Sequence, residues 1–428
     1  MYEPRPDERE RTLVIGLARP AVPRLMVEEH LDELERLVDT AGGEVVDRMV
    51  QERERPDPAT LVGSGFLEGI ADQCIELKVQ SVVFDEDLTG SQARNIEKVI
   101  SQDVKVLDRA AVILDIFAQR ARTREAQTQV ELAQLNYLLP RLTRRWTHLS
   151  RQAGGIGTRG VGETQLEIDR RLITKRIAHL KDKLKIIERD RRRRRNRRWA
   201  VPTIALVGYT NAGKSSLFRR LTRADVLVED RLFATLDPRT RRVDLEHEVS
   251  ALMVDTVGFV RKLPHHLVAP FRSTLEEAVE ADVVVHVVDA THPAWQEHLR
   301  VGEVTLGELG VDAERTVVVL NKIDLLSRQA LPSLPGGRGM PLSAVTGEGL
   351  GQFREALRNR VLSAPGVSVL RIPLRENRVV ERAVALPGQM ARRFTGDTMD
   401  LAVRADPERL REAALEDYRV ERWNEEER

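Results

Sequence analysis

A strand–loop–helix segment near the middle of the chain constrains the fold most strongly. The apolar run Ile204–Gly208 leads into Gly-Tyr-Thr-Asn-Ala-Gly-Lys-Ser, which ends at Ser215, and a helical pattern follows from Ser216. Glycines let the backbone wrap a phosphate with several N–H groups pointing inward, and the helix N-terminus adds partial positive charge. The spacing predicts a phosphate-binding loop between a strand and a helix of an α/β domain.

The residue types in this loop fit the chemistry of a nucleoside triphosphate. Lys214 places a full positive charge beside the β and γ phosphates, and the hydroxyl of Ser215 is a natural ligand for Mg²⁺. We therefore expect the whole loop to contact the nucleotide, through Gly208, Tyr209, Thr210, Asn211, Ala212, Gly213, Lys214, Ser215 and Ser216.

Two later segments have the spacing of the remaining phosphate contacts. The run Leu252–Phe259 predicts a strand that ends at Asp255, which can hold Mg²⁺ through water, and the amide of Gly258 can meet the γ-phosphate. A loop between the two motifs offers Thr235 as a second hydroxyl ligand for Mg²⁺. The predicted catalytic residues are Lys214, Thr235 and Gly258, and the expected contacts in these segments are Phe233, Ala234, Thr235, Leu236, Asp237, Asp255, Thr256, Val257 and Gly258.

A fourth motif indicates which base is bound. The run Val317–Asp324 is a strand followed by Asn-Lys-Ile-Asp, and the carboxylate of Asp324 can accept the ring N–H and the exocyclic amine of guanine. Adenine offers no such pair of donors, so an unpaired carboxylate would oppose its binding. The expected base contacts are Asn321, Lys322, Ile323 and Asp324, with Ser343, Ala344 and Val345 from a later loop. The motifs together predict an Mg²⁺-dependent enzyme that hydrolyses GTP to GDP and phosphate.

The motifs lie in one of four expected parts of an α/β protein. Residues 12–121 alternate strand-like and helical runs, which predicts an N-terminal αβ domain over residues 1–121 with a parallel or mixed sheet. Residues 122–199 predict a long helical hairpin, residues 200–362 a P-loop GTPase domain, and residues 363–428 a small α+β appendage.

The predicted hairpin carries the apolar spacing of two long helices around a glycine-rich tip. Apolar residues recur at intervals of three and four from Leu132 to Leu149, and a second seam runs from Ile173 to Ile187. Between the seams, five glycines lie within Gly154–Gly162. Pro140 should kink or divide the first helix.

The hairpin is also strongly basic. Residues 141–198 hold 20 Lys or Arg and 6 Asp or Glu, a local charge of +14 in a chain whose net charge is +1. Such a segment suits RNA, whose phosphates its arginines can meet, although a solvated helix face would have the same composition. The run Arg191–Arg195 is denser than solubility requires.

The rest of the composition narrows the class of protein. The single cysteine, Cys74, excludes an intrachain disulfide and a Cys-based zinc cluster, and is expected to be a small apolar filler on a helix. The chain has no apolar run near the roughly 20 residues that a membrane helix needs. The polar N-terminus lacks the apolar core of a signal peptide, so we expect a cytoplasmic protein with no transmembrane segment.

From residue 12 to residue 362 the chain resembles the HflX family of translational GTPases. The most specific stretches lie outside the nucleotide motifs, at Val106–Leu142 and Leu149–Arg171. Val161 departs from the family, which usually has Pro there, and Phe66 stands where a Lys is common. The resemblance implies a protein, expected to be monomeric when free, that binds ribosomal RNA of the large ribosomal subunit near its catalytic centre and splits or rescues stalled or idle ribosomes.

The residues themselves leave other functions open. One is a nucleotide-gated module for binding RNA or for ribosome assembly, in which hydrolysis is incidental. Another is a partner GTPase for an RNA-modifying enzyme.

One expected catalytic group is missing. Many GTPases orient the attacking water with a Gln directly after the DxxG motif, but here that position is Phe259. The missing group can come from the large ribosomal subunit or from a K⁺ ion held by Asn211, whose alternative role is to brace the loop.

Overall fold

The structure is a computed structural model of the chain. It describes residues 9–101, 103–142, 165–196, 201–222, 232–233, 238–245, 249–261, 277–327, 334, 339–420 and 423. The chain divides into two compact units, with the main boundary between Ile187 and Glu188. Across the described ranges, no helix combines the length and the hydropathy needed to cross a membrane.

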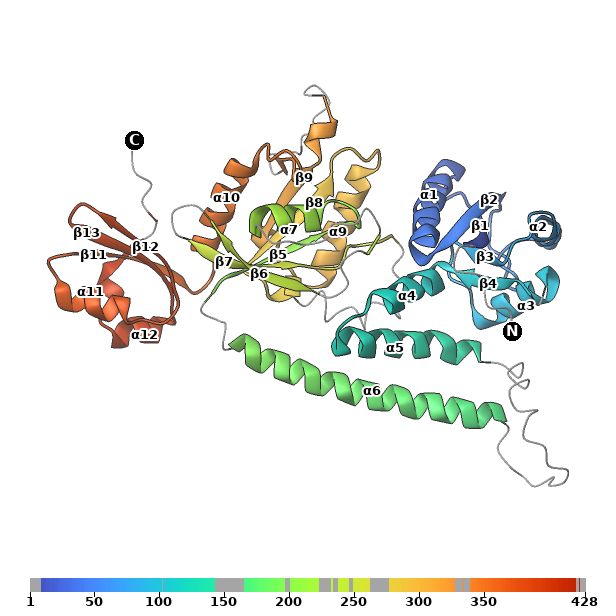
Figure 1. Ribbon diagram of the computed structural model, residues 1–428, viewed down its shortest axis with the longest axis horizontal. Helices are drawn as coiled ribbons and strands as arrows, with labels where there is room; N and C mark the ends of the chain where they lie inside the picture. The colour runs from blue at the N-terminus through green and yellow to red at the C-terminus, as the bar shows by residue number, and fades with distance from the viewer. Residues whose placement is uncertain are drawn as a thin grey trace. The chain divides into compact units, whose positions relative to one another are not determined.

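The first unit begins with a four-stranded parallel sheet in the order β2-β1-β3-β4, as expected (Figure 1). Helix α1 packs beside α4 and α2 beside α3. Leu13, Ile15 and Leu17 alternate along β1 and share a core with α2 and α3, which also holds the buried Cys74. The elements are β1 (Glu10–Ala18), α1 (Arg24–Ala41), β2 (Gly43–Glu52), α2 (Ser64–Glu76), β3 (Ser81–Phe84), α3 (Gly90–Ile100), β4 (Lys105–Asp108) and α4 (Arg109–Arg120).

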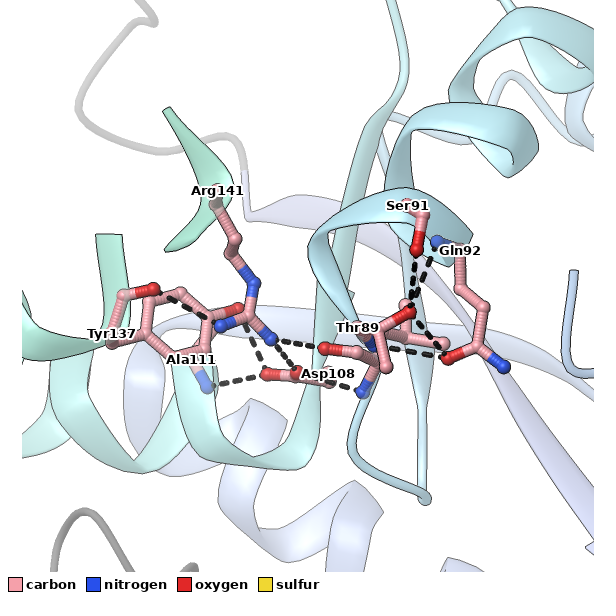
Figure 2. Close-up of polar contacts among 8 residues, drawn as sticks. Thr89, Ser91, Gln92, Asp108, Ala111, Tyr137 and Arg141 are labelled. Carbon is pink, nitrogen blue, oxygen red and sulfur yellow. Dashed lines mark hydrogen bonds and ion pairs between the residues drawn. The ribbon is translucent and has the colours of Figure 1, made fainter. Parts of the chain in front are cut away.

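A buried carboxylate joins the helix that carries Tyr137, Arg124–Leu138, to this sheet. Asp108 ends β4, and its side chain accepts hydrogen bonds from the amides of Leu88 (3.1 Å) and Ala111 (3.0 Å). It also accepts from the hydroxyl of Tyr137 (2.9 Å) and from Arg141 Nη2 (2.6 Å), as Figure 2 shows. The Arg141 guanidinium lies 3.6 Å from the centre of the Tyr137 ring. Four donors, one of which is the Arg141 cation, therefore compensate the burial of this charge.

The next elements are α5 (Arg124–Leu138), a 3-10 turn at Leu139–Arg141 and the long helix α6 (Gln165–Asn196), whose residues up to Ile187 belong to the first unit. The two expected seams meet, because Leu132, Ile177 and Leu180 form a buried cluster, and α5 and α6 lie side by side (Figure 1). The prediction from Pro140 is confirmed, because the first helix ends at Leu138, two residues before this proline. The glycine-rich tip, Trp146 and Leu149 lie outside the described residues.

The second unit is built around a six-stranded sheet in the order β10-β9-β8-β5-β7-β6, parallel except for the β6–β7 pair. Its largest core packs Leu217 and Phe218 of α7 and Phe353 and Leu357 of α10 with strand residues. The elements are β5 (Thr203–Gly208), α7 (Lys214–Thr222), β6 (Arg239–Asp244), β7 (Ser250–Asp255), β8 (Val283–Asp289), α9 (Trp295–Glu308), a 3-10 turn at Ala313–Arg315, β9 (Thr316–Asn321), a 3-10 turn at Ile323–Leu325, β10 (Gly339–Pro341) and α10 (Leu350–Leu362).

The C-terminal appendage is a four-stranded antiparallel sheet in the order β12-β13-β11-β14 with two helices, which confirms the α+β expectation. It packs on the six-stranded sheet: Met390 and Ala391 share a core with Met253, and the Arg404 guanidinium bonds both oxygens of Asp282 at 2.7 and 2.8 Å. The elements are β11 (Val367–Pro373), α11 (Asn377–Val384), β12 (Gln389–Thr395), β13 (Thr398–Arg404), α12 (Pro407–Glu412), a 3-10 turn at Glu416–Tyr418 and β14 (Arg419–Val420).

Candidate nucleotide-binding site

The predicted phosphate loop follows β5 and turns into α7. Its two glycines stand where no other residue fits. Gly208 has φ +140°, and a Cβ there would lie 2.1 Å from the carbonyl oxygen of Val287 on β8. Gly213 has φ +91°, and a Cβ there would lie 2.2 Å from Nδ2 of Asn321. The loop is therefore wedged between β8 and the guanine motif, and side chains at these positions would force it out of shape.

The lysine and serine of the loop point into the fold. Lys214 is buried, and its Nζ donates to the carbonyls of Gly208 (3.0 Å) and Tyr209 (2.8 Å). Burial lowers the pKa of Lys214 to about 8, partly offset by the nearby charge of Asp255.

The two oxygen groups expected to serve Mg²⁺ lie together. Ser215 Oγ donates to Oδ2 of Asp255 at 2.8 Å, and Asp255 is fully buried at the end of β7. Hydroxyl and carboxylate oxygens are the ligands that Mg²⁺ prefers, so this pair fits the ion. Thr235, the second expected ligand, lies outside the described residues with Ala234, Leu236 and Asp237. Phe233 is described, and it is buried with φ +54°.

The segment after β7 folds back onto the phosphate loop. The amide of Phe259 donates to the carbonyl of Gly208, and the amide of Thr210 donates to the carbonyl of Phe259, both at 2.8 Å. Thr256 anchors the segment by donating from Oγ1 to the carbonyl of Leu206 at 2.6 Å. Both Thr256 and Val257 are buried. The phosphate loop and the segment after β7, which lie far apart in the chain, are thus joined by backbone hydrogen bonds.

The guanine motif is braced from two sides. Asn321 Nδ2 donates to the carbonyl of Ala212 in the phosphate loop (2.9 Å), and its Oδ1 accepts from the amide of Ala344 (3.0 Å). The hydroxyl of Ser343 accepts from the amide of Val345 (3.2 Å). Asp324 is exposed, as a carboxylate that pairs with a base requires. The two base loops therefore meet beside the phosphate loop through Asn321 and Ala344, and Ile323 is buried.

Sequence reasoning missed two residues that hold this site. Asp289 at the end of β8 pairs with Lys322 Nζ at 2.7 Å, and hydrogen bonds from Thr291 fix its carboxylate. Burial alone would raise the pKa of Asp289, but its bonds to Lys322 and Thr291 bring that pKa below the ordinary value. The only available signal was an acidic residue at the end of an apolar strand.

The second residue is His298 on α9. Its ring is stacked on the ring of Tyr209, with centroids 3.9 Å apart and planes 7° apart. Burial lowers the pKa of His298 to about 4, with help from His292 and Arg261, so the ring is neutral at pH 7. Nothing in the sequence connects this helix position with the first residue after Gly208.

Three family models match the chain. One described as "GTP-binding GTPase N-terminal" matches residues 28–118, and one described as "GTP-binding GTPase Middle Region" matches residues 120–198. The third, "50S ribosome-binding GTPase", matches residues 203–322. The chain also aligns with a crystal structure of a complex of SsGBP with GDP at 26% identity and a TM-score of 0.46, over 81% of this chain and 97% of that one.

Curated relatives cover most of the chain. The GTPase HflX of Flavobacterium psychrophilum is 50% identical over 315 residues, which is 74% of this chain and 76% of the relative. The GTPase HflX of Escherichia coli is 44% identical over 360 residues, which is 83% and 84% of the two chains. At such identity over such coverage, this chain belongs to the HflX family of GTPases.

Proposed function

We propose that this GTPase binds the large ribosomal subunit in the cytoplasm as a monomer and splits or rescues stalled or idle ribosomes, with hydrolysis timing its release. The observation that carries the proposal is the union, in one chain, of a guanine-nucleotide site and a basic helix, α6, which contains the run Arg191–Arg195. The description of the matching family model, "50S ribosome-binding GTPase", supports the same partner.

Within the nucleotide site, the proposed roles are those that the sequence motifs predict. Lys214 meets the β and γ phosphates, Ser215 and Thr235 hold Mg²⁺ with Asp255 acting through water, and Asp324 selects guanine. When bound, Mg²⁺ neutralises charge that develops on the phosphates. Asn321 contributes by position, since it joins the phosphate loop to the base loop.

A second ion is proposed for the catalytic step. Asn211 stands in the phosphate loop with φ +61°, a backbone conformation that asparagine tolerates better than most residues. We assign it as a ligand for K⁺, whose charge would replace the group that Phe259 cannot supply. A loop brace is the alternative role for Asn211.

The alternative function is a nucleotide-gated module for binding RNA or for ribosome assembly. It is favoured by the same basic helix, which would dock on RNA whether or not hydrolysis followed. The two functions differ in what happens to the ribosome after binding.

The test is sedimentation of 70S ribosomes with the protein under GTP, GDP and a non-hydrolysable GTP analogue. The proposal expects subunits to separate with GTP and with the analogue, and not with GDP. Lys214→Ala should abolish the separation. Binding to intact ribosomes without separation under any nucleotide would favour the assembly module instead.

A further inference from the structure

Tyr209 links the phosphate loop to two other elements. Its ring is buried and stacked on His298 of α9, and its hydroxyl accepts the amide proton of Arg261 at 2.7 Å. Arg261 lies two residues after Phe259, in the segment that follows the DxxG motif. One side chain of the phosphate loop thus holds the backbone of that segment, and α9 fixes the orientation of the side chain.

The same segment is also held by the backbone pairing of Phe259 with Gly208 and Thr210. This pairing brings Gly258 against the loop: a Cβ at Gly258 would lie 2.8 Å from Cα of Thr210 and 2.9 Å from Nζ of Lys214. A γ-phosphate has to lie between that ammonium and the amide of Gly258. The segment must therefore move away before GTP can bind, whereas GDP has no group that needs this space.

We propose that Tyr209 and His298 form a latch that holds residues 258–261 against the phosphate loop and so sets the preference of this protein between GDP and GTP. The proposal rests on the phosphate-loop assignment made above. Both residues act as specificity determinants through the position of the segment and do not touch the reacting atoms.

The surroundings of the latch keep it rigid. His298 is 7% exposed, and its ring lies 4.3 Å from that of His292, whose Nδ1 accepts the amide of Ala294 at the start of α9. One turn further along α9, Gly302 leaves room for the buried ring of His286, since a Cβ would lie 2.2 Å from its Nε2. That ring meets Phe259 edge-on at 6.3 Å. Helix α9 therefore packs directly on Tyr209 and, through the ring of His286 on β8, on the latched segment.

A ligand shifts a two-state equilibrium only by its differential affinity for the two states. Loss of one hydrogen bond from the closed state should therefore raise the preference for GTP over GDP by about three- to tenfold. Tyr209→Phe removes the acceptor for Arg261 and keeps the stack. His298→Ala removes the stack, and His298→Phe restores an aromatic ring.

The experiment measures the dissociation constants of GDP and of a non-hydrolysable GTP analogue for each variant, with thermal melting as a check of folding. Tyr209→Phe and His298→Ala should shift the ratio of the two constants three- to tenfold toward the analogue. His298→Phe should stay within twofold of wild type. Tyr418→Phe, which removes a hydroxyl bonded to Glu376 in the C-terminal appendage, is the matched control and should not shift it.

Hydrogen exchange supplies an independent reading. With GDP bound, the amide of Arg261 should exchange faster in Tyr209→Phe than in wild type. The latch would be overturned if Tyr209→Phe kept both the wild-type ratio of the two dissociation constants and the wild-type exchange rate of the Arg261 amide. If Tyr209→Phe does not fold, the contrast between His298→Ala and His298→Phe decides. Failure of the phosphate-loop assignment looks different, because Lys214→Ala would then bind both nucleotides like wild type.

Discussion

Asn321 and Asp324 belong to one sequence motif, yet their environments assign them different tasks. Asn321 is buried and bonds two loops, whereas Asp324 is exposed. We predict that Asp324→Asn weakens GTP and GDP equally, by about 10- to 100-fold, because only the pairing with the base is lost. Its melting temperature should stay near that of wild type, and Asn321→Ala should lower both affinity and melting temperature. Equal competition by ATP against the wild-type protein would refute the guanine assignment.

Lys214 is the residue on which the phosphate assignment depends. We predict that Lys214→Ala loses at least about 100-fold in affinity for GTP, since it removes the full positive charge that would meet the β and γ phosphates. Titration with a fluorescent GTP analogue measures the loss. Lys105→Ala, which removes an exposed lysine from the first unit, should bind like wild type. An unchanged affinity in Lys214→Ala would mean that the loop binds something else.

At the scale of elements, the attachment of α5 to the parallel sheet depends on Asp108 and Arg141. The Asp108 side chain is fully buried and that of Arg141 is 18% exposed. Removal of the cation would leave a buried carboxylate with neutral donors only. We therefore predict that Arg141→Ala destabilises the first unit by about 2–4 kcal/mol.

The single cysteine provides the measurement. Burial raises the pKa of Cys74 to about 11, so at pH 8 its thiol is protonated and reacts only when the unit opens. Thiol labelling at pH 8 should be about 30- to 1000-fold faster in Arg141→Ala than in wild type. The control Arg176→Ala removes an exposed ion pair between Arg176 on α6 and Glu131 on α5, and its Cys74 should be labelled at the wild-type rate. Equal labelling rates in all three proteins would contradict the role given to Asp108.

The elements that sequence reasoning found are those with a local signal. Apolar runs predicted β1, β5, β7 and β9, and the seam of leucines predicted the pairing of α5 with α6. Strand β12 was not predicted, because Arg392 and Arg393 interrupt any alternation of apolar residues. Its buried residues Met390 and Ala391 pack in the core of the six-stranded sheet, whereas Phe394 is exposed. Contacts between side chains distant in the chain, such as Tyr209 with His298, carry no local pattern and had to be read from the structure.

At the scale of the whole molecule, the proposed function requires α6 to contact RNA. We predict that replacing Arg191, Arg193 and Arg195 with Gln weakens ribosome association and reduces its dependence on salt. The variant would neutralise fewer phosphates, so fewer counterions would be released when it binds. GTP affinity should not change. The matched control replaces three exposed arginines of the C-terminal appendage, Arg375, Arg378 and Arg382, with Gln. Association that is flat between low and moderate salt in the wild type would support a solvated helix face.

Phe259 occupies the position from which many GTPases orient the attacking water. Phe259 is 6% exposed, packs edge-on against His286 and is paired to the phosphate loop through its backbone. It can neither accept nor donate a side-chain hydrogen bond, so it cannot orient water. Arg239, Arg241 and Arg261 lie close in sequence to the Thr235 and Phe259 segments. Arg239 lies on β6, Arg241 donates to the carbonyl of Thr240, and the backbone amide of Arg261 donates to the hydroxyl of Tyr209. Among the described residues, the site supplies Lys214 and the amide of Gly258, and we propose that the water-orienting group comes from the ribosome or from a bound K⁺ ion.

We predict that the isolated protein hydrolyses GTP slowly in Na⁺, on the order of 10⁻⁴ to 10⁻² s⁻¹, as unassisted GTPases do. Ribosomes should raise the rate by at least about tenfold, since they would supply or position the group that orients the attacking water. If Asn211 holds K⁺, exchange of Na⁺ for K⁺ should raise the rate as well, and Asn211→Ala should abolish that increase while ribosome stimulation persists. A brace role for Asn211 predicts equal rates in the two salts. Fast turnover in Na⁺ without ribosomes would show that the chain already holds a complete catalytic apparatus, and that the buried Phe259 marks no missing group.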